Sequence, residues 1–289
     1  MPLSKKQGVG SSILPLATIM KKKLNSFQKN VYSQLGEDGI LETVFPFLNK
    51  KIVDLFVVEF GAWDGVHLSN TFNFIEQGAS ALLIESDEER FQDLMITAKK
   101  FPKIIPKNVY VESVGKNTLD NIIDKLDTNN KNPDILSIDI DSVNNLAIWK
   151  STKLEPSILI IEFDTRFLSF ETQESLKNNK IEKDNLFFDT YEYTVSRGYK
   201  LIYTSFNMIF AKENIFKELN KNYLMQPNPY KMFDFRNFIK FRVISRTELI
   251  KMYLKNYKLI PFKYFLLKLS PKMIKNIYFK NFYYKGLNR

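Results

Sequence analysis

Short apolar runs alternate with longer amphipathic stretches along the chain from residue 55 to residue 211. A short continuous apolar run is typical of a buried strand, and apolar residues recurring every three or four positions are typical of a helix. The runs predict strands over residues 55–60, 81–84, 108–111, 135–140, 157–163, 200–203 and 207–211. The amphipathic stretches predict helices over residues 70–77, 88–100, 118–126, 146–150 and 190–197.

This order of elements predicts an α/β fold built on one main sheet. Residues 158–161 are all apolar, which a strand requires when helices cover both faces of its sheet. The last two strands are joined by a turn too short for a crossover helix, so they must pair antiparallel. We therefore expect a doubly wound, mostly parallel, Rossmann-like sheet of seven strands that is closed by an antiparallel hairpin.

Charge divides the 289 residues into an acidic body and a basic tail. From Lys212 onward there are 18 Lys and Arg against 4 Asp and Glu, a balance of +14 in a chain whose total is +10. The predicted sheet is complete before this tail. We expect an N-terminal arm at residues 1–30, a ligand-binding domain at residues 31–222 and a basic, aromatic, helical appendage at residues 223–289.

The tail combines lysines with Phe, Tyr, Leu and Ile at helical spacing around residues 251–275, as an interfacial segment does. We expect it to dock on an anionic membrane surface, with a dimerisation or lid element as the alternative. No nucleic-acid-binding motif accompanies the charge, so nucleic acid is not expected as a partner. The chain has no cysteine, no secretory signal and no apolar run of about 18 residues, so we expect a cytoplasmic protein, peripheral at most to the inner membrane face.

A glycine-containing turn follows the first predicted strand, in the sequence VVEFGAWDG of residues 57–65. Such a turn lets the backbone approach a ligand at the switch point of a doubly wound sheet. Glu85 ends the second strand about 20 residues later, the spacing of an acceptor for ribose hydroxyls. Gly61 and Glu85 therefore predict a nucleotide-type pocket, with a solvated strand end as the alternative interpretation of Glu85.

Four acidic residues follow the fourth and fifth predicted strands: Asp139, Asp141, Glu162 and Asp164. Asp139 and Asp141 are two positions apart, so both side chains leave the strand on the same side. Asp139, Glu162 and Asp164 could hold Mg²⁺ or Mn²⁺ through oxygen ligands; alternatively Asp141 or Asp139 is a general base that the others orient. His67, the only histidine, is another candidate proton acceptor, with local packing as its alternative role.

Four segments, in this order, resemble the FkbM-like methyltransferases. They are residues 31–41 with the sequence Ser-Gln-Leu-Gly-Glu-Asp, residues 59–71 ending in His-Leu-Ser-Asn-Thr, residues 137–149 beginning Ser-Ile-Asp-Ile-Asp, and the Gly198-Tyr199 pair with Asn207. The resemblance covers residues 30–215. It implies an S-adenosylmethionine-dependent O-methyltransferase that acts on a hydroxyl of a sugar or glycan precursor of bacterial capsule or lipopolysaccharide.

The resemblance also implies which residues hold this cofactor. They would be Gln34 and Asp38 at its methionine end, Gly61, Asp64, Asn70 and Asp139 beside them, Glu85 at the ribose, and Glu112 and Ser113 near the adenine. Related sugar O-methyltransferases bind a divalent metal with acids at the ends of the fourth and fifth strands, which would be Asp139 and Glu162 here.

Two positions depart from the pattern of these proteins. Trp63 replaces the middle glycine of most cofactor loops in the class, and Asn145 stands where the family usually has an aspartate. An amide cannot accept a proton as a carboxylate does, so a non-catalytic protein that kept the fold is one rival interpretation. A metal-dependent glycosyltransferase would also use Asp139 and Asp141, but it would not need Glu85. A nicotinamide-dependent dehydrogenase would need a tighter Gly-x-Gly-x-x-Gly turn.

Overall fold

The computed structural model describes residues 21–126, 131–140, 145–162 and 187–225. Its strands are β1 (Phe56–Phe60), β2 (Ser80–Glu85), β3 (Ile104–Asn108), β4 (Ile135–Ile138), β5 (Ile158–Glu162), β6 (Tyr199–Thr204) and β7 (Asn207–Lys212). Its helices are α1 (Glu37–Val44), α2 (Phe72–Glu76), α3 (Glu88–Lys100), α4 (Leu119–Asp124), α5 (Asn145–Ser151), α7 (Phe187–Ser196) and α8 (Glu213–Asn222). Three short 3₁₀ helices, η1 (Leu24–Phe27), η2 (Phe45–Leu48) and η3 (Ile52–Asp54), precede β1.

The seven strands form one sheet in the order β3-β2-β1-β4-β5-β7-β6. Strands β1 to β5 pair in parallel, and β7 lies antiparallel between β5 and β6. The predicted doubly wound sheet and its closing hairpin are therefore confirmed. The order reverses between β1 and β4, so the carboxyl ends of these strands form the switch point where such folds bind ligands.

The third strand differs from its prediction. Residues 108–111 were expected to form it, whereas β3 spans Ile104–Asn108 and includes Pro106. Proline donates no backbone hydrogen bond, but β3 is an edge strand that pairs only with β2, and an edge tolerates the missing donor. The apolar residues that suggested the strand, Val109 and Val111, instead line a pocket beyond its end.

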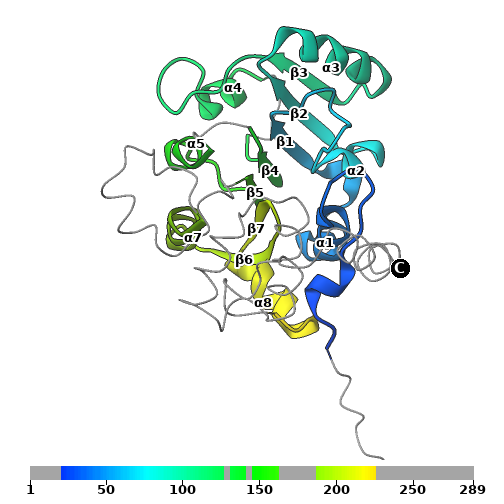
Figure 1. The fold of residues 1–289 in the computed structure, drawn as a ribbon, viewed down its shortest axis with the longest axis vertical. Helices are drawn as coiled ribbons and strands as arrows, with labels where there is room; N and C mark the ends of the chain where they lie inside the picture. Colours follow the sequence, from blue (N-terminus) through cyan, green and yellow to red (C-terminus); the bar gives the residue numbers. More distant parts are fainter. Residues whose placement is uncertain (1–20, 127–130, 141–144, 163–186, 226–289) are drawn as a thin grey trace, which may run out of the picture.

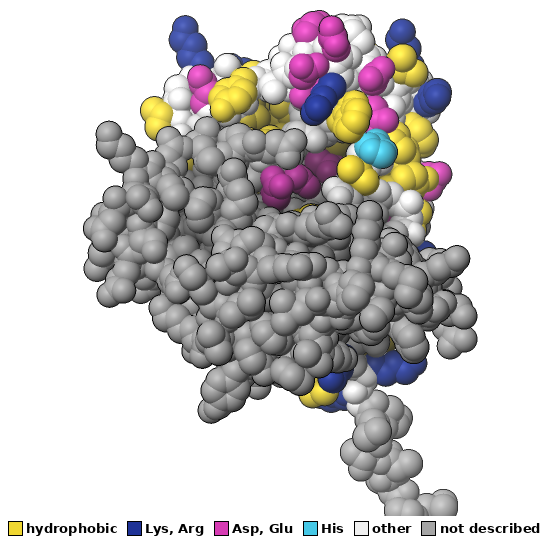
Figure 2. All heavy atoms as spheres, in the orientation of Figure 1, with side chains coloured by type: hydrophobic (Ala, Val, Ile, Leu, Met, Phe, Trp, Pro, Cys, Tyr) yellow, Lys and Arg dark blue, Asp and Glu magenta, His cyan; other side chains and the backbone are white. Residues whose placement is uncertain are grey.

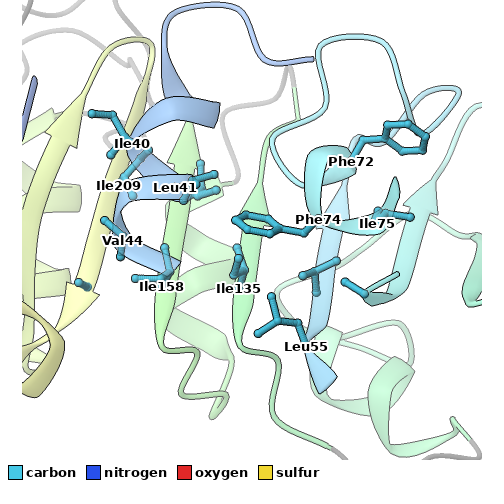
Figure 3. Packing of buried hydrophobic residues seen from close by; sticks show 14 of the residues in the cluster. Ile40, Leu41, Val44, Leu55, Phe72, Phe74, Ile75, Ile135, Ile158 and Ile209 are labelled. Atoms are coloured by element: carbon cyan, nitrogen blue, oxygen red, sulfur yellow. The ribbon is translucent and has the colours of Figure 1, made fainter. Parts of the chain in front are cut away.

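Helices cover both faces of the sheet (Figure 1). On one face, Ile40, Leu41 and Val44 of α1 pack with Ile135 and Ile158 of the sheet, as Figure 3 shows. This layer continues through α2, α3 and α8. The opposite face buries the alternate strand residues under α4, α5 and α7, and this layer includes the fully buried Trp149. The two layers take successive residues of each strand, which is why the central strands read as unbroken apolar runs.

The N-terminal segment crosses α1 and reaches α8. A Cβ at Gly39 would overlap the Phe27 carbonyl oxygen, so a glycine is required where η1 passes over the helix. The Leu224 backbone N–H then donates to the Lys22 carbonyl at 2.9 Å, and the rings of Phe27 and Tyr223 meet edge to face at 5.3 Å. Residues on either side of the predicted domain, 21–30 and 223–225, thus pack on its body.

The predicted N-terminal arm, basic appendage and membrane docking concern the two ends of the chain. Most of the N-terminal arm (residues 1–20) and most of the basic appendage (residues 226–289) lie outside the described residues, so membrane docking stays a prediction. None of the described helices is both long enough and apolar enough to cross a membrane.

Arg197 joins α7 to the loop after α5. Its guanidinium lies 3.8 Å above the Trp149 ring centre and donates to the carbonyls of Trp149 (3.0 Å), Thr152 (3.2 Å) and Leu154 (2.8 Å). We expect Arg197→Ala to lower the free energy of unfolding in urea by about 3 kcal/mol. Arg197→Lys should recover less than half of this loss, because an ammonium cannot form the planar fork. An alanine variant within about 0.5 kcal/mol of wild type would contradict this role.

Candidate functional site

A pocket of about 360 Å³ opens at the carboxyl ends of β1, β2 and β4. It is lined by Phe60, Gly61, Ile84, Glu85, Ser86, Asp87, Arg90, Val109, Tyr110, Val111, Asp139 and Ile140. Figure 2 shows acidic side chains recessed in a hollow of this face. Two acids that line the pocket, Glu85 and Asp139, come from strands on opposite sides of β1, so the pocket has a carboxylate on each side of the glycine turn.

Gly61 lies between these carboxylates with a left-handed φ of 77°. A Cβ here would overlap the Asp139 carbonyl oxygen, so the closeness of β4 alone requires a glycine. The backbone N–H groups of Gly61 and Ala62 both donate to the Ile84 carbonyl at 3.1 Å. The turn is therefore hydrogen-bonded to β2 and packed closely against the end of β4, and Gly61 forms part of the pocket wall.

Glu85 is the buried carboxylate at the end of β2 and is 4% exposed. Its Oε2 accepts from the Trp63 backbone N–H at 2.9 Å, and its Oε1 accepts from the Asp87 N–H at 2.8 Å. One side chain thus fixes the loops that follow β1 and β2. Each carboxylate oxygen can accept more than one hydrogen bond, so Glu85 can still receive hydroxyl groups from the pocket.

Asp64 organises the middle of the loop after β1. Its Oδ1 accepts from the backbone N–H groups of Val66 (2.9 Å) and His67 (2.6 Å). This loop exposes His67, Leu68 and Trp63, and it holds Trp63 and Leu68 at positive φ (48° and 60°). Bulky residues seldom adopt this conformation unless surrounding contacts enforce it.

Arg90 of α3 also lines the pocket. Its guanidinium lies 4.8 Å from the Trp63 ring centre, and the Trp63 ring meets the His67 ring edge to face at 5.1 Å. The only histidine is therefore exposed and packed against an aromatic ring. It is not among the residues that line the pocket.

Glu59 is a buried carboxylate inside β1, 3% exposed. Its Oε2 accepts from the hydroxyls of Ser69 and Thr71, both at 2.6 Å, and its Oε1 accepts from the Asn70 N–H at 3.0 Å. Burial raises the pKa of Glu59, and these hydrogen bonds partly oppose the rise. No role was predicted for Glu59, although a charge within an otherwise apolar strand is a signal for one.

Asp139 follows β4 and is partly buried at the pocket. The Asn70 amide donates to its Oδ2 at 3.2 Å. Burial raises the pKa of Asp139 to about 7, and the charges of Glu59 and Glu37 add to the rise, while hydrogen bonds with Asn70 and Asn207 oppose it. This carboxyl therefore changes its charge near neutral pH and would favour a cationic partner.

The motif at residues 34–38 acts mainly on its own loop. Asp38 Oδ2 accepts from the backbone N–H groups of Val31, Tyr32 and Ser33 at 2.7–2.8 Å, and among the described residues its buried Oδ1 has no partner. Glu37 accepts from the Ser205 hydroxyl and the Leu35 N–H, and burial raises its pKa. The side chain of Gln34 is exposed.

Asn145, where a family aspartate was expected, joins the ends of two strands. Its buried amide donates to the carbonyls of Ile140 (3.2 Å) and Glu162 (3.3 Å) and reaches the Glu162 Oε2 at 3.5 Å. All three partners are acceptors, which an aspartate could not satisfy. The amide nitrogen of Asn145 is therefore matched to its surroundings, whereas its buried Oδ1 has no partner among the described residues.

The structure brings some of the predicted residues together and separates others. Gly61, Glu85 and Asp139 line the pocket, and Asn70 contacts Asp139 behind it. Glu112 and Ser113 follow the lining residue Val111 without lining the pocket themselves; the Glu112 carboxylate accepts from the Asn117 N–H at 3.3 Å. Asp141, the predicted base, and Asp164, a predicted metal ligand, lie outside the described residues. Within the described ranges, no group of three or more acidic or histidine side chains could hold a metal ion.

The solved structures that resemble this chain include three of low sequence identity. No family model and no curated protein matches the chain. Fibrillarin of Methanococcus jannaschii, a pre-rRNA processing protein, is 15% identical over 56% of this chain and 67% of its own, with a TM-score of 0.38. TrmK of M. capricolum, solved with S-adenosyl-homocysteine, is 12% identical over 85% and 95%, with a TM-score of 0.43. Precorrin-6y C5,15-methyltransferase of Geobacter metallireducens GS-15 is 12% identical over 65% and 95%, with a TM-score of 0.38.

The fold is assigned from the strand order of the chain itself. A parallel sheet that reverses between β1 and β4 and ends with β7 antiparallel between β5 and β6 is the Rossmann-like fold of class I methyltransferases.

Asn145 clamps the ends of two strands through the carbonyls of Ile140 and Glu162. This clamp can be tested with aspartate, the residue that the resemblance to FkbM-like methyltransferases would place there. We expect Asn145→Asp to lower the free energy of unfolding by about 2–4 kcal/mol, because it buries a carboxylate against two carbonyls and Glu162. The matched control is Asn121→Asp, since the exposed Asn121 amide also donates to two carbonyls, those of Gly115 and Lys116. Equal unfolding midpoints for the two variants in urea would show that Asn145 does not clamp the strands.

Proposed function

We propose that this protein is an S-adenosylmethionine-dependent methyltransferase that transfers a methyl group to a hydroxyl of a sugar or glycan. The observation that supports this most is the pocket at the switch point of the sheet, with Glu85 on one side of Gly61 and Asp139 on the other. The class I strand order and the resemblance of residues 30–215 to FkbM-like methyltransferases agree with it.

The pocket has the chemical division that this cofactor needs. Glu85 can accept two ribose hydroxyls, and apolar residues on either side, Ile84, Val111 and Ile140, suit the faces of an adenine ring. Asp139 lies on the other side of Gly61, where it would face the cationic methionine end. Asp139, whose pKa lies at about 7, is thus the group that we propose contacts the positive charge of the cofactor.

The bound cofactor supplies an activated methyl group on a sulfonium. The protein then has to hold the acceptor oxygen in line with this methyl group and keep water out. A sugar hydroxyl is a weak nucleophile, so a carboxylate base is expected to take its proton. Asp139 is the candidate among the described residues, and Asp141 is a candidate beyond them. A divalent cation is not needed for this assignment.

The acceptor is proposed from the family resemblance, which points to bacterial surface polysaccharides. A glycan precursor carried on a lipid would also give the basic residues 223–289 a purpose, since lysines would meet anionic headgroups beside the acceptor.

Cofactor binding is tested directly by calorimetric titration of the full-length protein with S-adenosylhomocysteine. Because Glu85 is the proposed ribose ligand, we expect Glu85→Ala to weaken binding about 10- to 100-fold. Glu89→Ala on the exposed side of α3 is the control and should bind as wild type does. Failure of wild type to bind contradicts the proposed function, and wild-type affinity in Glu85→Ala contradicts the role of Glu85.

The pH dependence of S-adenosylmethionine binding follows from Asp139. Its pKa lies at about 7 instead of 3.8, so the carboxyl is neutral below this value and charged above it. A cationic ligand prefers the charged form, and we expect the affinity to fall about tenfold for each pH unit below 7. Titrations between about pH 5.5 and 8.5 measure this. Asp139→Asn should bind weakly at every pH, and a pH-independent wild type would be inconsistent with Asp139 at the cationic end.

A further inference from the structure

We propose that Glu59 and Asn70 form a positioning relay for Asp139, in which Glu59 fixes the turn at residues 69–71 and Asn70 then holds the Asp139 carboxylate. The catalytic relevance of the relay rests on the proposed function, which places Asp139 at the cofactor. Glu59 itself does not line the pocket. It therefore acts on Asp139 through Asn70 and through its charge, and not by contact with a ligand.

The first part of the relay fixes the turn before α2. The Glu59 carboxylate accepts from the hydroxyls of Ser69 and Thr71 and from the Asn70 N–H, three consecutive residues at 2.6–3.0 Å. Ser69 Oγ in turn accepts from the backbone N–H of Phe72, the first residue of α2, at 3.0 Å. Within the described residues, no hydrogen bond or salt bridge connects Glu59 to a lysine, arginine or histidine, and the donors to its carboxyl group are neutral.

The second part of the relay uses the Asn70 side chain. Its Nδ2 donates to Asp139 Oδ2 and to Ser137 Oγ, both at 3.2 Å. An amide nitrogen has two hydrogens, so both are used inside the protein and neither is left to bind the cofactor. The resemblance implied that Asn70 binds the cofactor; this geometry gives its amide nitrogen a positioning role instead.

The two members of the relay act on Asp139 in opposite directions. The charge of Glu59 raises the pKa of Asp139, and the hydrogen bond from Asn70 lowers it. The other groups that face Asp139 are Glu37 of α1, which raises the pKa, and Asn207 of β7, which lowers it. Arg90 of α3 lines the same pocket.

The test therefore compares two variants by carbon NMR of the Asp139 carboxyl, titrated in the full-length protein without ligand and assigned with Asp139→Asn. Asn70→Leu keeps the size of the side chain and removes the donor, so the Asp139 midpoint should rise by about one pH unit. Glu59→Gln keeps the shape and removes the charge, so the midpoint should fall. The matched control is Asn73→Leu, because the Asn73 amide, also buried and close by, donates to Glu42 away from the pocket, at 2.9 Å.

The same variants are then titrated with S-adenosylhomocysteine as a function of pH. The pH at which binding is half lost should move with the NMR midpoint, upward for Asn70→Leu and downward for Glu59→Gln, and Asn73→Leu should leave it in place. An Asp139 midpoint that does not rise in Asn70→Leu, or that stays fixed in Glu59→Gln, would overturn the relay. Opposite NMR shifts in a protein that does not bind S-adenosylhomocysteine would overturn the proposed function and leave the relay standing.

Discussion

The loop from Gly61 to Thr71 has little regular secondary structure, so its backbone N–H groups need acceptors other than a helix or a strand. Backbone carbonyls accept from some of them, and three carboxylates accept from others: Glu85 at the beginning of the loop, Asp64 in its middle and Glu59 at its end. Glu59 belongs to β1, Glu85 belongs to β2, and Asp64 belongs to the loop itself. The conformation of the loop therefore depends on two strands of the sheet as well as on its own sequence. The pocket depends on this loop, because the loop sets the position of the Gly61 backbone, the Trp63 ring and the Asn70 amide.

This arrangement concentrates negative charge. Glu37, Glu59 and Asp139 are near enough for the charges of both glutamates to raise the pKa of Asp139, and no described lysine or arginine forms a salt bridge with any of the three. Buried carboxylates without a cation either take up protons or attract a positively charged ligand. The fold thus makes a site whose preference for a cation increases with pH, which is the property that a sulfonium cofactor would use.

Much of the fold could be predicted from the sequence because central strands covered on both faces are apolar throughout. The sheet and its hairpin followed from that pattern. The edge strand β3 did not, since Pro106 is tolerated only at an edge, and a sequence pattern does not show where the edge lies. The helix α1 was also missed, because residues 34–38 were interpreted as a ligand motif, whereas Asp38 mainly caps its own loop.

The residues of the site likewise divide into those that the sequence predicted and those that it did not. Gly61, Glu85 and Asp139 come at strand ends, where topology alone brings them together. Glu59 and Asn70 depend on how a loop folds back on its strand, and no spacing rule describes this. Asn145 was interpreted as a lost acid because a sequence pattern does not show which atoms surround a residue in space. In the structure three acceptor atoms surround its amide nitrogen.

A crystal structure of the full-length protein with S-adenosylhomocysteine would locate both ends of the ligand relative to the loop. We expect the ribose hydroxyls on Glu85, the amino group of the homocysteine end near Asp139, and the loop 61–71 unchanged with its three carboxylates in place. A ligand bound elsewhere, or a loop that leaves Glu59, Asp64 and Glu85 to make room for it, would show that these carboxylates do not build a cofactor site.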